Sequence, residues 1–295
     1  MICIDWGTSS FRAFRLNAQG EVLERLHAPR GILQVAEGGF PEALTELVGD
    51  WLRAGDTRLL LSGMVGSRQG WREAPYLETP AGIDDLAGAL MPVSVGAAQG
   101  FIVPGLIARG ATGVPEIMRG EETQIMGVLP ALGERAIACL PGSHSKWARV
   151  AGGRIVDFTT AMTGEAFAAL RQHTILGRLM AGDTHDAAGF DEGVVRSADP
   201  GGLLHHAFGV RTRGITGDLP DAAAASYLSG ILIGHDVRAA LDLHGRDGIV
   251  HLIGDPALCG LYGRALAACN VPHSIASGDA AILGLARIGD LAPWQ

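Results

Sequence analysis

A run of small and polar residues at positions 5–10 (DWGTSS) follows an apolar segment at the start of the chain. Gly7 lets backbone N–H groups approach a phosphate closely, and the hydroxyls of Thr8 and Ser9 add further donors. Asp5 is suited to hold a magnesium ion, because this hard cation prefers carboxylate and phosphate oxygens. The pattern therefore predicts a phosphate-binding turn, although an ordinary hairpin turn with a hydrogen-bonded aspartate has the same composition.

A second run of this kind covers residues 140–147 (LPGSHSKW). Gly142, Ser143 and His144 form its turn, and Lys146 follows as the one lysine among 23 basic residues, the other 22 being arginines. A compact ammonium differs from a guanidinium in shape and hydration, so Lys146 is expected near a phosphate or as a support of the turn. The chain has no Gly-Lys pair, which excludes the P-loop pattern. His144 taken alone is more often a loop residue than a catalyst.

A third turn lies in residues 249–256 (IVHLIGDP), where a strand pattern runs into Gly254 and then into a helix that begins with proline. Such a turn brings backbone against a flat ligand such as adenine, with Leu258 close by. By itself the signal is weak, because any α/β protein contains turns of this kind.

The periodicity of the remaining chain predicts elements that position these turns. The segments 2–25 and 137–158 share the order strand, small-residue turn, strand, glycine turn, strand, which favours two duplicated α/β halves over a chance similarity. Helices are predicted over residues 41–53, 121–129, 221–243, 256–268 and 279–288.

Composition limits the classes of partner. The chain has 295 residues, 31 acidic against 23 basic, and a net charge of −8, so general nucleic-acid binding is disfavoured. A hydrophobic fraction of 47% with 18% charged residues excludes intrinsic disorder. The apolar stretch 222–234 is too short to span a membrane, which needs about 20 residues. Four cysteines without a CxxC pair and a start that runs directly into a strand predict a cytoplasmic protein without a signal peptide.

In this order the three turns resemble those of the sugar kinase, heat-shock chaperone and actin superfamily. More specifically, the chain resembles the 2-dehydro-3-deoxygalactonokinase family. The segments that carry this resemblance are IDWGTSSFRAFRL, SGMVGSRQGWREAPYLETPAG, MRGEETQIMG, LPGSHSKWARVAGGRIVDFTTAMTGE and SYLSGILIGHD, all within residues 2–236. The resemblance implies an α/β fold of two ribonuclease H-like halves with an ATP cleft between them. It also implies ATP- and Mg²⁺-dependent phosphorylation of the 6-hydroxyl of 2-dehydro-3-deoxy-D-galactonate in galactonate catabolism.

The second turn departs from the superfamily, many of whose members carry an aspartate there, so Asp5 is the main candidate for the metal. By analogy with related sugar kinases, the catalytic base is expected at the helix start formed by Glu121 and Glu122. A carboxylate there can accept the hydroxyl proton as the oxygen attacks the γ-phosphate. Adjacent helical residues point about 100° apart, so only one can face the substrate, and we favour Glu121. The alternative is that both carboxylates only stabilise the N-terminus of the helix through its dipole and have no catalytic role.

A sugar acid needs a partner for its carboxylate. Arg68 lies in a glycine-rich loop and offers a planar, bidentate donor. Trp71 and Tyr76 would supply flat walls for the sugar carbons, and Ser62 and Ser67 would donate to its hydroxyls. Arg68 could equally be one of many surface arginines.

The expected division places the first turn and the sugar loop in residues 1–115, with helix 279–295 packing back on this half, and the other two turns in residues 116–278. Several readings stay open: a kinase of the same fold for another keto-deoxy acid or an amino sugar, a non-catalytic ATP or sugar sensor, and a phosphohydrolase. The residues do not separate galacto- from gluco-configured acids. They leave the oligomeric state open, a homodimer included.

Overall fold

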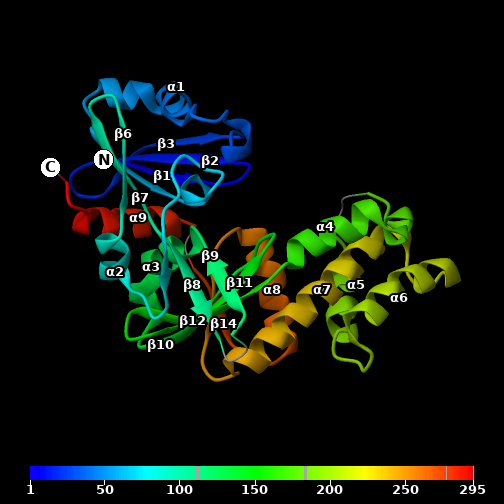
Figure 1. Ribbon diagram of the computed structural model, residues 1–295. Coiled ribbons are helices and arrows are strands. Elements are labelled where there is room, and N and C mark those ends of the chain that lie inside the picture. The colour runs from blue at the N-terminus through cyan, green and yellow to red at the C-terminus, as the bar shows by residue number, and fades with distance from the viewer. Residues whose placement is uncertain (111–112, 183–184, 277, 295) are drawn as a thin grey trace. The chain divides into compact units, whose positions relative to one another are not determined.

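The computed structural model describes the chain except for residues 111–112, 183–184, 277 and 295. The chain forms two compact units (Figure 1). Unit 1 comprises residues 1–135, 150–158 and 279–295, and unit 2 comprises residues 136–149 and 159–278. The predicted boundary after residue 115 falls inside unit 1. The reason is packing between helices that are distant in sequence. α3 (Glu121–Leu132) packs on α9 (Ala280–Leu291), and α9 in turn contacts β1 and β4.

The large sheet of unit 1 has the strand order β3-β2-β1-β4-β7-β6. β1 pairs antiparallel with β2 and parallel with β4, which pairs parallel with β7. Apolar residues of β1 and β4 are fully buried, as expected for strands covered on both faces. The strands are β1 (Ile2–Trp6), β2 (Phe11–Leu16), β3 (Val22–Ala28), β4 (Arg58–Ser62), β6 (Met91–Val95) and β7 (Ala98–Ile102).

A smaller sheet of unit 1 has the order β5-β8-β9. Its strands are β5 (Tyr76–Glu78), β8 (Gly105–Arg109) and β9 (Pro115–Met118), and β9 leads directly into α3. The other helices of unit 1 are α1 (Phe40–Arg53) and the short α2 (Ile83–Gly88).

Helices α3 and α9 approach each other at two glycines. A Cβ on Gly127 of α3 would lie 2.0 Å from the Ala280 carbonyl oxygen, and a Cβ on Gly284 of α9 would lie 1.9 Å from the Thr123 carbonyl oxygen. No side chain fits at either position. The pair of helices is therefore in backbone contact, and α9 fixes the first turns of α3 from the far end of the sequence.

The second sheet has the order β12-β11-β10-β13-β14, which repeats the arrangement β3-β2-β1-β4-β7 of the first. In both sheets three consecutive strands are followed by parallel strands, β10 pairing parallel with β13 and β13 with β14. The predicted duplication of the two segments is thus confirmed as a repeated topology. The strands are β10 (Arg135–Leu140), β11 (Ser145–Ala151), β12 (Arg154–Ala161), β13 (Val250–Leu252) and β14 (His273–Ile275).

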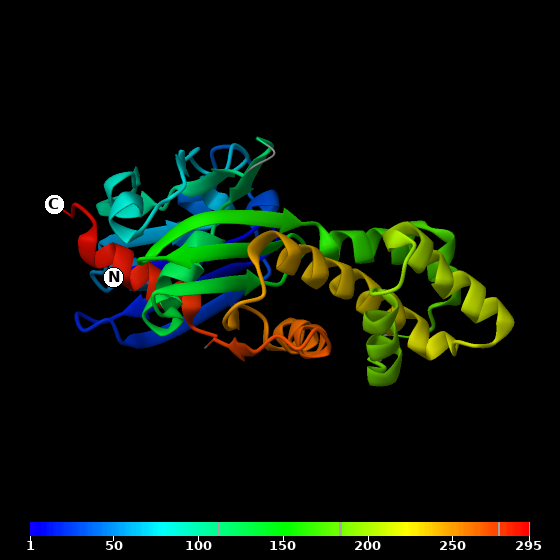
Figure 2. The same ribbon diagram turned by 90° about the horizontal axis from the view of Figure 1, so that it is seen from below.

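Unit 2 contains a group of helices, in which α4, α5 and α6 lie around the first part of α7 (Figures 1 and 2). The helices of the unit are α4 (Thr163–His173), α5 (Ala187–Arg196), α6 (Gly202–Thr216), α7 (Asp221–His244) and α8 (Pro256–Ala268). Although α7 is long, none of the helices described is long and apolar enough to cross a membrane.

Candidate active site

Three backbone turns of unit 1 converge at the end of β1. Asp5 on β1 pairs in register with Ser62, the last residue of β4. A Cβ on Gly63 would lie 2.8 Å from the Trp6 carbonyl oxygen and 3.3 Å from Asp5 Oδ1. A Cβ on Gly120, just before α3, would lie 3.1 Å from the Gly63 Cα. The turns after β1 and β4 and the start of α3 therefore form one cluster.

Asp5 is a largely buried carboxyl group in this cluster, with 18% of its side chain exposed. Burial raises the pKa of Asp5, and the charge of Arg12, whose Nη1 lies 4.0 Å from Asp5 Oδ2, opposes that rise. A carboxylate held away from water gains from a bound cation. In the described part of the chain no three His, Cys, Asp or Glu side chains are grouped to hold a metal. The carboxylate of Asp5 fits a hard cation such as magnesium, although it would be the one ligand from the described residues of this cluster.

The first turn itself is a closed hairpin. The Gly7 N–H donates to the Ser10 carbonyl at 2.9 Å, and the Gly7 carbonyl accepts from the Ile32 N–H at 3.0 Å. Thr8 and Ser9 at its tip are exposed. The tip of this turn is therefore accessible to solvent.

The two candidate bases at the start of α3 have different surroundings. Glu122 is fully buried, and both of its carboxylate oxygens accept the Gly120 N–H, at 2.9 and 2.7 Å. Burial, and then the charge of Glu121, raise the pKa of Glu122 to about 7. Glu121 is half-buried, and its Oε2 accepts the Arg119 N–H at 3.0 Å. Of the two, only Glu121 is partly exposed.

Arg119 was not singled out by the sequence, yet this residue is buried, with 8% of its surface exposed, and contacts the sugar loop. Its Nη2 donates to the Ala74 carbonyl at 2.8 Å, and its Cζ lies 4.2 Å from the centre of the Tyr76 ring. A Cβ on Gly66 would lie 3.0 Å from Arg119 Nη1. Arg119 Nε and Nη1 have no hydrogen-bond partner within the described residues. Arg119 therefore links the loop to the residues that start α3.

The predicted sugar loop lies in unit 1 between β4 and β5. Ser62 is buried, and Ser67 Oγ is a buried atom without a hydrogen-bond partner in the described parts of the chain. Arg68 is 88% exposed and its Nε lies 3.6 Å from Glu73 Oε1. Trp71 is half-buried and packs on the apolar core of unit 1, whereas Tyr76 is partly exposed over Arg119. Ser67, Arg68 and Trp71 thus lie in the loop itself, and Ser62 and Tyr76 are the strand residues at its two ends.

The second turn connects β10 and β11 in unit 2. Ser143 and His144 at its tip are exposed, and Lys146, in β11, is buried at 6% exposure. The first turn of α4 holds this hairpin, because the Glu165 N–H donates to the Ser143 carbonyl at 3.1 Å. Glu165 Oε2 also lies 2.5 Å from His144 Nε2. His144 is thereby directed toward α4.

The third turn lies next to the second. Gly254 has a φ of +133°, a conformation that favours glycine, and the Pro141 carbonyl oxygen is the nearest atom, 3.8 Å from where its Cβ would be. Asp255 caps α8 by accepting the Leu258 N–H at 3.0 Å. The predicted phosphate and adenine turns are thus neighbours in unit 2.

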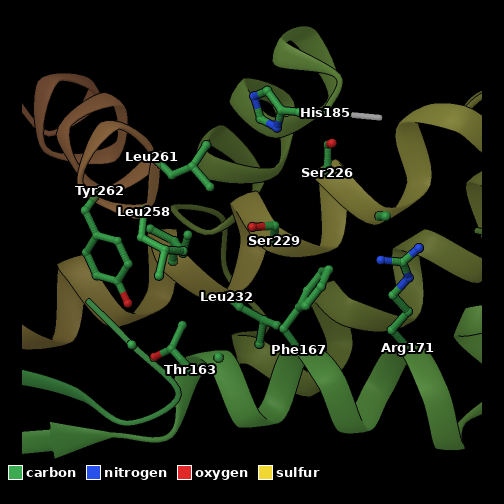
Figure 3. A pocket seen from close by; sticks show the side chains of 14 residues that line it. Thr163, Phe167, Arg171, His185, Ser226, Ser229, Leu232, Leu258, Leu261 and Tyr262 are labelled. Carbon is green, nitrogen blue, oxygen red and sulfur yellow. The ribbon is translucent and has the colours of Figure 1, made fainter. Parts of the chain in front are cut away.

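A pocket of about 250 Å³ opens beside these turns and lies wholly within unit 2 (Figure 3). Its walls are mainly apolar, and they come from α4, α7 and α8. Usual ligand pockets measure roughly 300–1,000 Å³, so this one suits part of a ligand of that size rather than the whole. The residues that line it include two predicted ones, Gly142 and Leu258, together with Thr163, Gly164, Phe167, Arg171, His185, Ala225, Ser226, Ser229, Leu232, Ile233, Leu261 and Tyr262.

Asp236 of α7 connects the pocket to the second turn. Its Oδ2 accepts hydrogen bonds from Ser145 Oγ at 2.6 Å, Thr163 Oγ1 at 2.7 Å and Tyr262 Oη at 2.6 Å. Its Oδ1 accepts from Trp147 Nε1 at 3.0 Å. The second turn has no aspartate of its own, and a buried carboxylate from a distant helix lies beneath it instead.

Sequence reasoning missed Arg119, Asp236 and most of the pocket wall. The one available signal for Asp236 was a single acid within the apolar pattern of residues 223–241, because a buried charge there needs partners. For Arg119 no local signal existed, since one arginine among 22 is not distinctive.

Comparison with known proteins decides the family. The profile of the 2-keto-3-deoxy-galactonokinase family matches residues 5–288. The chain belongs to this family. A protein assigned as a 2-dehydro-3-deoxygalactonokinase in Rhizobium meliloti (strain 1021) is 36% identical over 95% of this chain and 92% of its own. The 2-dehydro-3-deoxygalactonokinase of Escherichia coli (strain K12) is 33% identical over 95% of this chain and 94% of its own.

Solved structures agree with the family. A structure assigned to the same kinase, from Sinorhizobium meliloti, matches with a TM-score of 0.91 at 35% identity and covers 97% of both chains. A dehydratase activator from Clostridium difficile with bound ADPNP has a TM-score of 0.53 at 13% identity over 97% of this chain and 92% of its own, which indicates the shared actin-like fold. The predicted fold class and family are confirmed. As a member of the 2-keto-3-deoxy-galactonokinase family, the chain is an ATP-dependent carbohydrate kinase of galactonate catabolism.

Proposed function

We propose that the chain transfers the γ-phosphoryl group of ATP to the 6-hydroxyl of 2-dehydro-3-deoxy-D-galactonate with Glu121 as the base. The observation that carries this assignment is the contrast at the start of α3, where Glu121 has exposed surface and Glu122 is fully buried. The 6-oxygen attacks the γ-phosphorus as its proton passes to Glu121. The bond between the γ-phosphorus and the β,γ-bridging oxygen breaks, and ADP leaves.

Unit 2 would hold ATP. The apolar pocket with Leu258 in its wall suits a nucleoside, and Gly142, at the pocket, with Ser143 and His144 beside it, suits the phosphates. Gly254 would keep the neighbouring backbone turn close to the base. Lys146 would neutralise charge on the transferring group.

Unit 1 would hold the metal and the sugar acid. Asp5 would hold magnesium, which when bound neutralises phosphate charge. Thr8 and Ser9 would contribute hydroxyl donors to a phosphate, and Gly7 would let the backbone of the turn approach it closely. Arg68 would bind the sugar carboxylate as a bidentate donor. Ser62, Ser67, Trp71 and Tyr76 would contact the sugar.

Arg119 would act as a positioning residue for the sugar loop. Through the Ala74 carbonyl and the Tyr76 ring it holds two points of the loop, and Glu121 accepts its backbone N–H. The loop and the base are therefore tied to the same short segment, so a displacement of one would move the other.

The test is ADP release by the purified protein with MgATP and one of three acceptors: 2-dehydro-3-deoxygalactonate, its gluconate epimer, or none. We expect turnover that requires the galactonate compound and that falls at least a hundredfold in Glu121→Gln, as typical for loss of a general base. Glu37→Gln, an exposed control, should keep full activity. Loss in Glu122→Gln with retention in Glu121→Gln would move the base to Glu122, and phosphate release without acceptor would indicate a hydrolase.

A cytoplasmic location and a homodimer belong to the same proposal. The four cysteines are free thiols, as expected in a reducing compartment. On α6, Leu204 is 85% exposed and Phe208 and Ile215 are also exposed, which gives an apolar surface for a second copy. Fractionation of the source cells and light scattering of the purified protein test these two points.

A further inference from the structure

Asp236 accepts hydrogen bonds from three hydroxyl groups. An ionised carboxylate can only accept hydrogen bonds, and each hydroxyl has one proton to donate. Ser145, Thr163 and Tyr262 all lie within 2.7 Å of the same Asp236 oxygen. Ser145 Oγ also lies 3.3 Å from the Ala161 carbonyl oxygen. The short contacts of Thr163 and Tyr262, by contrast, direct their hydroxyl protons to Asp236. Burial, and then the Asp236 charge, hold the pKa of Tyr262 well above its ordinary value, so the phenol keeps the proton that it donates.

Two of these hydroxyls belong to the pocket. Thr163 and Tyr262 are among its lining residues, and Figure 3 shows their oxygens at the same end. With their protons turned to Asp236, they can offer a ligand only lone pairs. Phosphate oxygens are acceptors too, so they would find no donor there, whereas an O–H or N–H group of a ligand would find an acceptor.

Ser226 in another part of the pocket wall differs in this respect. Its Oγ accepts the Asp186 N–H at 2.9 Å, which leaves the hydroxyl proton able to serve an acceptor on the ligand. The hydroxyls of Thr163 and Tyr262, bound to Asp236, are therefore restricted to accepting hydrogen bonds from a ligand, whereas the hydroxyl of Ser226 can donate one.

We propose that Asp236 is a positioning residue that makes the Thr163 and Tyr262 end of the pocket an acceptor edge, selective for nucleotides with a hydrogen-bond donor on the nucleoside. The donor is an O–H or N–H, so it comes either from a ribose hydroxyl or from the exocyclic amine of adenine. This inference rests on the proposed nucleotide site in unit 2.

The experiment measures kcat/KM for ATP, 2′-deoxy-ATP, 3′-deoxy-ATP and the triphosphate of purine riboside, which lacks the amine. In the wild type we expect one analogue to lose at least fivefold against ATP, the range of a single hydrogen bond. In Tyr262→Phe and Thr163→Val, which keep side-chain volume, the ratio for that same analogue should move toward one. In Asp236→Asn the amide donates to a hydroxyl, whose proton then turns to the ligand, so the ratio should also shrink.

Tyr227→Phe is the matched control, because Tyr227 is an equally buried tyrosine of unit 2 that does not line the pocket. A purely structural role for Asp236 would lower activity with all four nucleotides alike and would leave the ratios unchanged. Ratios near one in the wild type, or ratios that persist in both Tyr262→Phe and Thr163→Val, would overturn the inference.

A variant that blocks the pocket tests the proposed nucleotide site separately from the acceptor edge. Leu261→Trp fills the pocket and should raise KM for ATP at least tenfold without changing KM for the sugar acid. An unchanged KM for ATP in Leu261→Trp would refute the nucleotide site and the inference with it. A raised KM together with ratios near one in the wild type would keep the site and refute the acceptor edge alone.

Discussion

Gly164 of α4 lies directly against the backbone of Gly142 in the second turn. A Cβ on Gly164 would be 2.6 Å from the Gly142 carbonyl oxygen and 2.9 Å from Ser143 Cα. No side chain fits in that space without moving the turn. The start of α4 therefore sets the position of the segment to which we assign the ATP phosphates.

Gly164→Ala tests this contact. The added methyl should displace the turn by a fraction of an ångström or more, and we expect KM for ATP to rise about tenfold, because misplacement of binding groups on this scale is costly. Steady-state kinetics with varied ATP provide the measurement. Gly260→Ala is the matched control, since Gly260 is a helical glycine of α8 with open space around it. It should keep KM and gain about 0.5–1 kcal/mol of stability. Equal KM values in the two variants would rule out the positioning role.

Glu122 should make the protein less stable as the pH rises. The pKa of Glu122 is about 7 in the folded chain against 4.5 for the free side chain. Between these two pH values the folded state therefore binds more protons than the unfolded state. The contribution is full below the unfolded value and is lost as the pH rises to about 7. It amounts to about 3 kcal/mol in the free energy of unfolding.

Urea unfolding at pH 5 and pH 8 measures this effect. The stability difference between the two pH values should be smaller in Glu122→Gln than in the wild type, because the variant cannot titrate at that position. Glu37→Gln, an exposed glutamate, should behave as the wild type. The same stability difference between pH 5 and pH 8 in all three proteins would show that Glu122 ionises freely in the folded state.

Substitution of Arg68 and of Arg119 should change KM for the sugar acid in different ways. Arg68→Met removes the proposed carboxylate partner, so KM should rise about tenfold or more for the sugar acid but not for an analogue with an amide in place of the carboxylate. Arg119→Met removes the anchor of the loop, so KM should rise for both compounds. Kinetics with each compound distinguish the roles, and Arg53→Met, an exposed change in α1, serves as control. Discrimination against the amide analogue that persists in Arg68→Met but is lost in Arg119→Met would assign the carboxylate to Arg119.

Lys146 should affect the chemical step. Lys146→Met removes the proposed charge near the transferring phosphoryl group, and loss of such a group typically lowers kcat by about 10²–10³-fold. Single-turnover measurements at saturating ATP report this step. Lys146→Arg keeps the charge and should recover part of the rate if charge is what matters. A change confined to KM for ATP would instead make Lys146 a support of the turn.

The sequence by itself determined the local parts of this protein. The turns at Gly7, Gly142 and Gly254 and the helix that begins at Glu121 are encoded by neighbouring residues, so they could be predicted one by one. The shared order of segments 2–25 and 137–158 also predicted the duplication that the two sheets display. Long motif matches predicted the family, which the relatives confirm.

Only the tertiary structure decided which of these parts meet. Asp236 is 91 residues from Ser145 in sequence, and Arg119 is 45 residues from Ala74, so no local pattern records either contact. The compact units also differ from the predicted halves, because residues 116–135, which include α3, and residues 150–158 belong to unit 1. The prediction that helix 279–295 packs back on the first half agrees with the contacts of α9 with β1 and β4. Such contacts depend on the shape complementarity of distant segments, as at Gly127 and Gly284, and that complementarity exists only once both segments have folded.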